Sequence, residues 1–168
     1  ELDEVDSATV IVTDNNAYIR ILKFDAVSKK NIAQYAYRLS PVAFPSIPSA
    51  AFKINGVPDI LSIGNNKLLV IERSFSTGYL PCTIRLFIAD LDGATDISNM
   101  ALKGNNNFTP ATKKLLLNMD DLGIYTDNIE GVTFGPVLPN GHKTLLFIAD
   151  NNFSPAEKAQ LLLFEVVE

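Results

Sequence analysis

The sequence has one cysteine and one histidine among its 168 residues, and each scarcity removes a class of site. A single cysteine, Cys82, excludes an internal disulfide and a metal cluster held by several thiolates, so we expect Cys82 to be a small buried hydrophobe. The single histidine, His142, lies in "LPNGHKT", which is typical of a hairpin tip. A histidine-rich zinc site is therefore excluded, and a Ser-His-Asp triad would depend on that exposed turn. The side chains that remain available for a binding or catalytic site are therefore mainly oxygen ligands.

The sequence also lacks a basic cluster and a long apolar run. The net charge is −5 and the lysines and arginines are scattered, which argues against nucleic acid or an anionic membrane as the main partner. No apolar stretch approaches the roughly 20 residues of a membrane-spanning helix. The chain starts with Glu1 and shows no signal-peptide pattern, so we expect it to be a piece of a longer protein.

Alternation of apolar and polar residues dominates the sequence, and helical periodicity is nearly absent. Apolar residues make up 47% of the chain, which is enough for one globular domain with a core. We expect the proline-rich segment 40–58 to be a rigid extended connection, and 94–110 to be a long polar loop or a short helical turn. The predicted strands are 8–13, 18–25, 31–39, 60–63, 67–73, 83–91, 113–117, 129–134, 144–149 and 160–167.

Three stretches share a layout of apolar strand, acid-bearing corner and second strand. They are "TVIVTDNNAYIRILKFD", "LLVIERSFSTGYLPCTIRLFIADL" and "LLFIADNNFSPAEKAQLLLFEV". The repeat is longer than a compact propeller blade, so we predict an all-β protein of about three loop-inflated antiparallel blades, a partial β-propeller. A β-sandwich is the alternative that the periodicity leaves open.

Three segments carry a family resemblance: "GVPDILSIGNNKLLVIERSFSTG", "DNIEGVTFGPVLPNGHKTLLFIADNNFS" and "QLLLFEV". In content, order and spacing they resemble the esterase-like phytase family, a phytase-like β-propeller domain often found in exported bacterial proteins. The family's domain is longer than this chain. The resemblance therefore implies that residues 1–168 form a single domain, the C-terminal part of a larger phytase-like domain, and that the protein is periplasmic or secreted.

Amide and carboxylate side chains follow several of the predicted strands. Asn128 and Glu130 lie two residues apart in "DNIEG", so on a strand they project from one face, and Gly131 permits a close approach. The strands "LLVIE" and "LLFIADN" also end on such side chains, which in a propeller can converge on the central channel. Carboxylates gathered there would repel one another unless a cation neutralised them, and Ca²⁺ takes roughly 6–8 oxygen ligands. The predicted metal ligands are Glu72, Asn128, Glu130, Asp150 and Asn151.

These side chains have ordinary structural explanations as well. Asparagine and aspartate after a strand commonly form turns, which applies to 14–16 and to 150–151. Glu72 and Arg73 are also typical of ion pairs with neighbouring strands. Asp59 is as well explained by a cap at the start of a strand as by a ligand role.

The resemblance implies a metal-dependent hydrolase of phosphate or carboxylate esters, with a small-molecule ester or phosphoester as its partner. Bound Ca²⁺ would polarise the ester oxygen or lower the pKa of a bound water, and Asp127 or Asp59 would be the general base. A calcium-dependent lactonase is the nearest enzymatic variant. The competing hypothesis is a non-catalytic propeller that binds a ligand or a protein, with a structural calcium or no metal. A third is a half-domain that is inactive until its missing blades are supplied.

Open sheet edges are a further expectation. Three blades do not close a propeller, so the terminal strands would expose unpaired backbone groups. The edges "LLLFEVV" and "ATVIVT" are apolar and contain neither proline nor lysine. We therefore predict that the chain self-associates through these edges.

Overall fold

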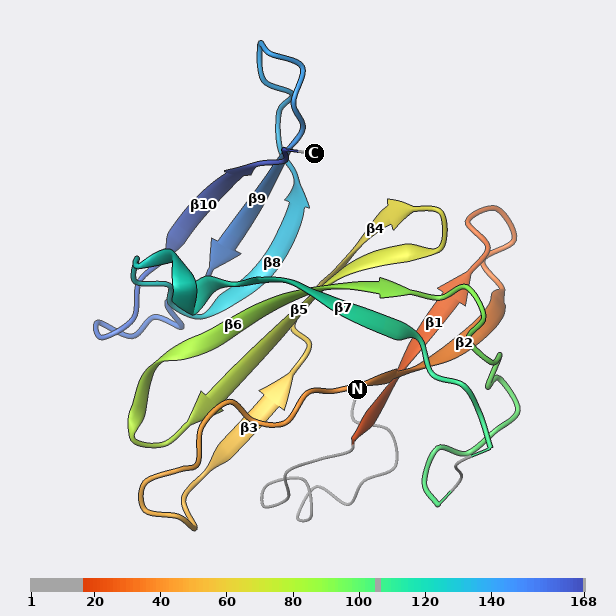
Figure 1. Ribbon diagram of the computed structural model, residues 1–168, viewed down its shortest axis with the longest axis horizontal. Helices are drawn as coiled ribbons and strands as arrows, with labels where there is room; N and C mark the ends of the chain where they lie inside the picture. Colours follow the sequence, from red (N-terminus) through yellow and green to blue (C-terminus); the bar gives the residue numbers. More distant parts are fainter. Residues whose placement is uncertain (1–16, 105–106, 168) are drawn as a thin grey trace.

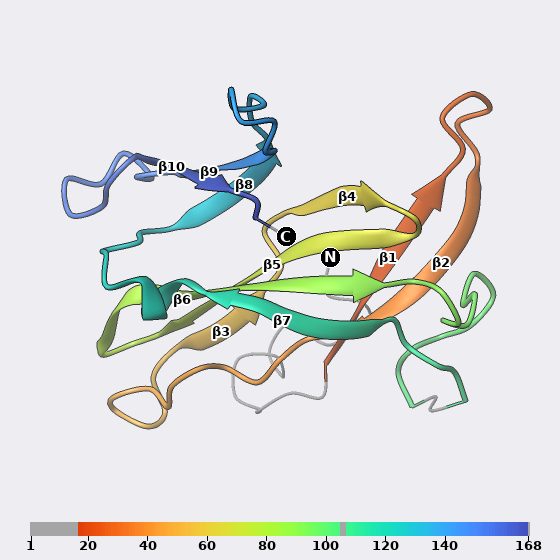
Figure 2. The same ribbon diagram turned by 45° about the horizontal axis from the view of Figure 1, so that its top comes forward.

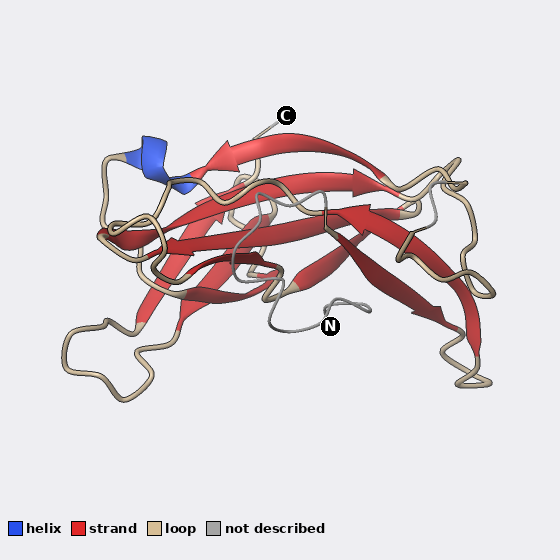
Figure 3. Ribbon diagram, turned by 90° about the horizontal axis from the view of Figure 1, so that it is seen from below, coloured by secondary structure: helices blue, strands red, loops and turns tan. Residues whose placement is uncertain are grey.

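The computed structural model describes residues 17–104 and 107–167, and nearly all of its regular structure is β-strand (Figure 1). Among the described residues the one helical element is a single 3₁₀ turn, η1 (Met119–Leu122), which follows β7 directly and is drawn in blue in Figure 3. The predicted strand 8–13 lies outside the described residues. The strands are β1 (Tyr18–Phe24), β2 (Asn31–Arg38), β3 (Lys53–Gly56), β4 (Ile60–Gly64), β5 (Lys67–Ser76), β6 (Tyr79–Asp90), β7 (Thr112–Asn118), β8 (Ile129–Phe134), β9 (Thr144–Ala149) and β10 (Gln160–Glu165).

The strands form three separate antiparallel sheets, which Figure 2 shows side by side. β1 pairs with β2, and the C-terminal sheet has the order β10–β9–β8. The central sheet has the order β3–β5–β6–β7, with β4 also paired to β5. β4 and β3 lie end to end along β5, because β4 pairs with 67–70 and β3 pairs with 73–76. The all-β, antiparallel class is confirmed.

Segment 40–58 departs from the prediction. The sequence predicts only an extended connection there, but the segment contains the strand β3. The prediction that it has no strand is therefore wrong. β3 is a four-residue strand between two proline-containing stretches, and it exists by pairing with the second half of β5. Such a short edge strand is stabilised by its neighbour more than by its own pattern. The nine other described strands lie within a few residues of their predicted positions.

The central sheet is buried on both faces, which explains the unbroken apolar run of β5. Leu68 and Val70 pack toward the β1–β2 sheet, whereas Leu69 and Ile71 pack toward the C-terminal sheet. The core on the first face is Ile21, Tyr37, Leu39, Leu68, Val70, Phe87, Ala89, Leu91 and Ala111. The core on the second face is Leu69, Ile71, Ile84, Leu86, Met119, Ile129, Val132, Phe147 and Ala149.

Three sheets packed in this way are not the two-sheet sandwich that the periodicity left open. The second and third repeat units of the sequence form the pairs β5–β6 and β9–β10, in different sheets. The first unit is described only from residue 17 onward. β10 is the edge strand of its sheet, as predicted, and on the outer face Leu161 and Leu163 are more than half exposed. A three-bladed propeller is not confirmed by this arrangement.

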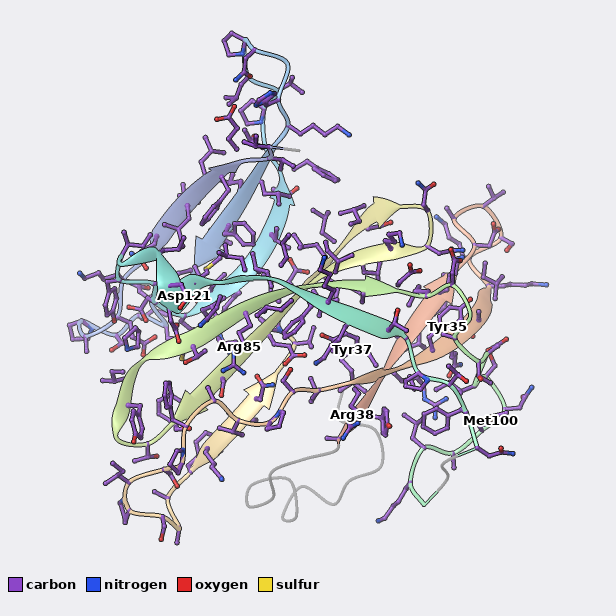
Figure 4. All side chains as sticks on the ribbon, viewed as in Figure 1. Tyr35, Tyr37, Arg38, Arg85, Met100 and Asp121 are labelled. Carbon is purple, nitrogen blue, oxygen red and sulfur yellow. The ribbon has the colours of Figure 1, made fainter. Side chains whose placement is uncertain are left out.

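A buried ion pair within the central sheet is hydrogen-bonded to β2. Glu72 of β5 is 1% exposed, and its Oε1 accepts hydrogen bonds from Lys113 Nζ at 2.5 Å and from Tyr37 Oη at 2.7 Å. Its Oε2 accepts from Asn55 Nδ2 at 2.8 Å and from the main-chain N–H of Ser40 at 3.1 Å. Figure 4 shows Tyr37 between β2 and the central sheet. This carboxylate is therefore saturated by four donors.

The ionisation of this cluster is set by its hydrogen bonds. Burial acts to raise the pKa of Glu72, but the hydrogen bonds from Lys113, Tyr37 and Asn55 outweigh it and leave the pKa below its ordinary value of 4.5. Burial and the adjacent carboxylate raise the pKa of Tyr37, which therefore stays a neutral donor. Glu72 and Lys113 are thus a charged pair at neutral pH.

We expect Lys113→Met to destabilise the protein by about 3–5 kcal/mol, because it leaves the Glu72 carboxylate buried without a cation. The double variant Glu72→Gln with Lys113→Met should lose less, since no charge is left unpaired. Urea unfolding of the three proteins measures both effects, and equal losses in the single and double variants would contradict the buried pair.

The same pair predicts a pH dependence. Because folding lowers the pKa of Glu72, its stabilising contribution is present above about pH 4.5 and is lost as the pH falls through the lower, folded-state pKa. The difference in thermal midpoint between the wild type and Glu72→Gln should therefore shrink at acidic pH. A difference that stays constant over that range would show that Glu72 does not titrate as described.

Candidate functional site

A cavity of about 580 Å³ opens where the core between the central and C-terminal sheets ends. One wall comes from β3, β5 and the start of β6, and the other from 125–128 and the loop between β9 and β10. The lining residues are Phe52, Ile54, Gly56, Val57, Pro58, Arg73, Phe75, Leu80, Pro81, Cys82, Tyr125, Asp127, Asn128, Asn152, Ala156 and Glu157. The cavity combines an apolar wall with a polar end.

Arg73 occupies the polar end. It follows Glu72 on β5, and because successive strand residues face opposite sides, it points toward the C-terminal sheet. Its Nη1 donates to Asn128 Oδ1 and, at 2.6 Å, to Glu130 Oε1. Asn128 Nδ2 donates to the same Glu130 oxygen at 2.7 Å. Within residues 17–104 and 107–167, no acceptor receives a bond from Arg73 Nε or Nη2.

A β-bulge in β8 presents Glu130 to this arginine. Ile129 pairs with Ala149 and Gly131 pairs with Ile148, which leaves Glu130 as the extra residue. Bulges re-aim side chains in this way and are common beside functional sites. A Cβ on Gly131 would lie 2.9 Å from Ile148 Cγ2, so the close approach of β9 to the bulge depends on glycine.

Asp127 stabilises the other wall of the cavity through hydrogen bonds. Its side chain is buried, its Oδ1 accepts from the N–H of Asn128 at 2.9 Å, and its Oδ2 accepts from the N–H of Lys158 at 2.7 Å. Tyr125 Oη donates to the same Oδ2 at 3.1 Å. Burial and this hydrogen bond raise the pKa of Tyr125, so its hydroxyl is neutral. Asp127 therefore holds the loop after β9 against the segment before β8.

Asp59 has a comparable structural role. It lies between β3 and β4, and its Oδ1 accepts from the N–H of Ile60 at 2.8 Å. Its Oδ2 accepts from the N–H of Val132 in β8, also at 2.8 Å. Asp59 thus ties the central sheet to the C-terminal sheet on the side where the bulge lies.

The structure brings some of the predicted site residues together and separates others. Asn128 and Glu130 are in contact, as their spacing predicted. Glu72 faces the opposite side of the central sheet, where its oxygens are bound by Lys113 and its neighbours. Asp150 and Asn151 form the turn after β9, with their Oδ1 atoms accepting from the N–H groups of residues 152 and 153 at 3.3 and 3.2 Å.

These residues, as arranged, do not fit one calcium ion. The position between Asn128 and Glu130 that a cation would take is occupied by the Arg73 guanidinium. The part of the chain that the structure describes contains no group of three or more His, Cys, Asp or Glu side chains that could hold a metal. Calcium binding by the predicted ligands stays a prediction.

Arg73 is the functional candidate that sequence reasoning underrated. Its sequence context indicates one member of a structural ion pair, and it does pair with Glu130. The available signal was its place in a strand with an unbroken apolar run, since a charge buried on such a strand requires a partner in the neighbouring sheet. The apolar wall and Tyr125 gave no signal, because their grouping depends on how the sheets pack.

Comparison with known proteins gives one match. The model of the phytase-like family, described as "Esterase-like activity of phytase", matches residues 4–153. No curated protein and no solved structure matches the chain. In the described residues, no helix is long and apolar enough to cross a membrane.

Gly131→Ala should destabilise the fold by about 1–3 kcal/mol, because the added methyl group would overpack against Ile148. Adding Ile148→Ala should recover part of the loss by removing the contacting methyl group. Gly56→Ala is the matched control, since a Cβ there meets no atom within 4 Å. Equal unfolding midpoints for Gly131→Ala and Gly56→Ala would show that the bulge tolerates a side chain.

Calcium binding can be tested by the thermal midpoint in saturating Ca²⁺ and in chelator. With Arg73 as the cation between Asn128 and Glu130, we expect the two midpoints to agree, because a ligand shifts the midpoint only by binding the native state. If the thermal midpoint instead rises in the presence of calcium, and Glu130→Gln abolishes that rise, the ion displaces the guanidinium.

Proposed function

We propose, because the chain belongs to the phytase-like family with its esterase-like activity, that the cavity beside Arg73 is the substrate site of an ester hydrolase. The proposal rests on the Arg73 guanidinium, which has hydrogen-bond donors that the described residues do not use. Nη1 is bound to Asn128 and Glu130, whereas Nε and Nη2 have no acceptor in the described part of the chain. Arg73 lines a cavity large enough for a small molecule.

Arg73 is the proposed group that stabilises the developing negative charge. Hydrolysis of an ester places negative charge on the carbonyl or phosphoryl oxygen in the transition state. Fixed donors beside that oxygen stabilise the charge most when they are oriented in advance. Asn128 and Glu130 supply this orientation, because both hold the same guanidinium nitrogen.

Glu130 is the proposed general base. Its Oε1 receives the bonds from Arg73 and Asn128, and its Oε2 has no hydrogen-bond donor in the described part of the chain. The side chain is 37% exposed, so water reaches it. Glu130 takes a proton from water as the water oxygen bonds to the carbonyl carbon or phosphorus. It returns that proton to the alkoxide when the ester bond breaks.

Asp127 and Asp59 stay predictions as general bases. Both carboxylates accept main-chain N–H bonds that hold the walls of the site, which favours a positioning role for them. A metal-dependent reaction also stays a prediction, and no step here requires an ion.

We also propose that the three sheets are blades of a propeller. The support is that the central sheet is covered by a neighbouring sheet on each face, as a blade is by the two beside it. Self-association through β10 and a periplasmic or secreted location stay predictions.

A non-catalytic binding site is the second candidate. It is favoured by the saturated hydrogen bonding of Asp127, because a fully bound carboxylate suits a fixed wall. In that case the cavity would bind an ester without hydrolysing it.

Hydrolysis of p-nitrophenyl acetate and p-nitrophenyl phosphate by the chain, with and without chelator, tests the proposal. We expect measurable turnover of at least one ester, and a loss of about 10²-fold in kcat/KM in Arg73→Met and in Glu130→Gln. Lys67→Met is the matched control, because Lys67 lies on the same strand and pairs with Asp90 away from the cavity. Unchanged rates in folded Arg73→Met would refute the assignment, and binding without turnover in the wild type would favour the second candidate.

A further inference from the structure

Much of the cavity lining is apolar. The apolar wall of the cavity consists of Phe52, Ile54, Val57, Pro58, Phe75, Leu80 and Pro81. Leu80 is 84% exposed and Phe52 is 46% exposed. The Phe52 and Phe75 rings lie 6.0 Å apart between centroids and form an aromatic pair in this wall. Large apolar side chains gathered along a cavity favour the binding of a ligand that has an apolar part.

The charges at the cavity do not suit a ligand with several anionic groups. Among the described lining residues Arg73 is the one basic side chain, and it is accompanied by the carboxylates of Asp127 and Glu157. Glu130 adds a third carboxylate in contact with the guanidinium. Lys158 lies near the cavity, with its ammonium 4.8 Å from the centroid of the Tyr125 ring. Sites for polyphosphates gather several cations, whereas this one has more acids than bases.

The free donors of Arg73 match a single anionic group. A guanidinium carries five N–H donors, and the two on Nη1 point to Asn128 and Glu130. The N–H of Nε and those of Nη2 form the planar fork that binds one carboxylate, or one face of a phosphate, with two parallel bonds. A second anionic group would meet carboxylates or the apolar wall.

We propose that the ligand of this cavity is an amphiphilic ester with an apolar body and no more than one anionic group, and that a polyphosphorylated compound is excluded. The apolar body lies along Phe52, Phe75 and Leu80, and the anionic or ester group lies against Arg73. This inference rests on the proposed function for the position of the site, and it adds the class of substrate.

Binding of three probes to the chain tests the inference: octanoate below its micelle concentration, acetate, and inositol hexakisphosphate. We expect octanoate to bind at least about tenfold more tightly than acetate in calorimetric titration, because only octanoate buries apolar surface on the wall. The hexakisphosphate should give no binding heat and no change in thermal midpoint.

Two variants locate the octanoate. Arg73→Met should weaken the binding of octanoate by about tenfold, because the contact with its carboxylate is lost. Leu80→Ser changes an exposed residue, so this variant should fold normally. It should weaken the binding of octanoate by about threefold and leave the binding of acetate unchanged. Leu163→Ser, on the exposed outer face of β10, is the control for non-specific binding and should have no effect.

Hexakisphosphate binding that Arg73→Met removes would overturn the inference, and so would octanoate binding that neither variant weakens. The octanoate outcomes are separate from the proposed function, because octanoate and acetate contain no ester bond that the protein could hydrolyse. Octanoate bound as expected, in a protein that hydrolyses no ester, would sustain the ligand class and refute the hydrolase.

Discussion

Two consecutive charges on a strand buried on both faces determine how the three sheets are joined. Glu72 and Arg73 point to opposite sides of β5, so each finds its partners on a different face of the central sheet. Glu72 binds Lys113 and Tyr37 on one side, and Arg73 binds Asn128 and Glu130 on the other. Because an unpaired buried charge costs several kcal/mol, Glu72 requires the cation of Lys113 in its own sheet, whereas the partly buried Arg73 takes its acidic partner from the C-terminal sheet.

The C-terminal sheet meets this requirement through the irregularity in β8. A regular ladder would leave no extra residue between Ile129 and Gly131, and the bulge supplies one whose carboxylate reaches Arg73. Asp59 and Asp127 then hold the flanking backbone through main-chain N–H groups. The polar end of the cavity is consequently held together by hydrogen bonds between segments that are distant in sequence.

The sequence predicts the strands well, because alternation is a local property, and it predicts the contact of Asn128 with Glu130, which follows from their spacing. It does not predict β3, whose four residues are stabilised by pairing with β5. Nor does it predict that Glu72 is separated from Glu130. The repeated corners suggested one shared locus, but a strand end has two faces, and the neighbouring sheets decide which face meets which partner. The cavity depends on the same packing, so residue patterns along the chain could not reveal it.

The cation at this site decides what the site can select. An ion such as Ca²⁺ accepts many oxygen ligands from several directions, and it could therefore gather several phosphate oxygens. A guanidinium is covalently fixed, stays charged across the physiological range and offers its donors in one plane. With Nη1 held by Asn128 and Glu130, Arg73 retains only one edge of that plane for a ligand. The shape of this remaining edge, next to an apolar wall, limits the number of anionic groups more strictly than the volume of the cavity does.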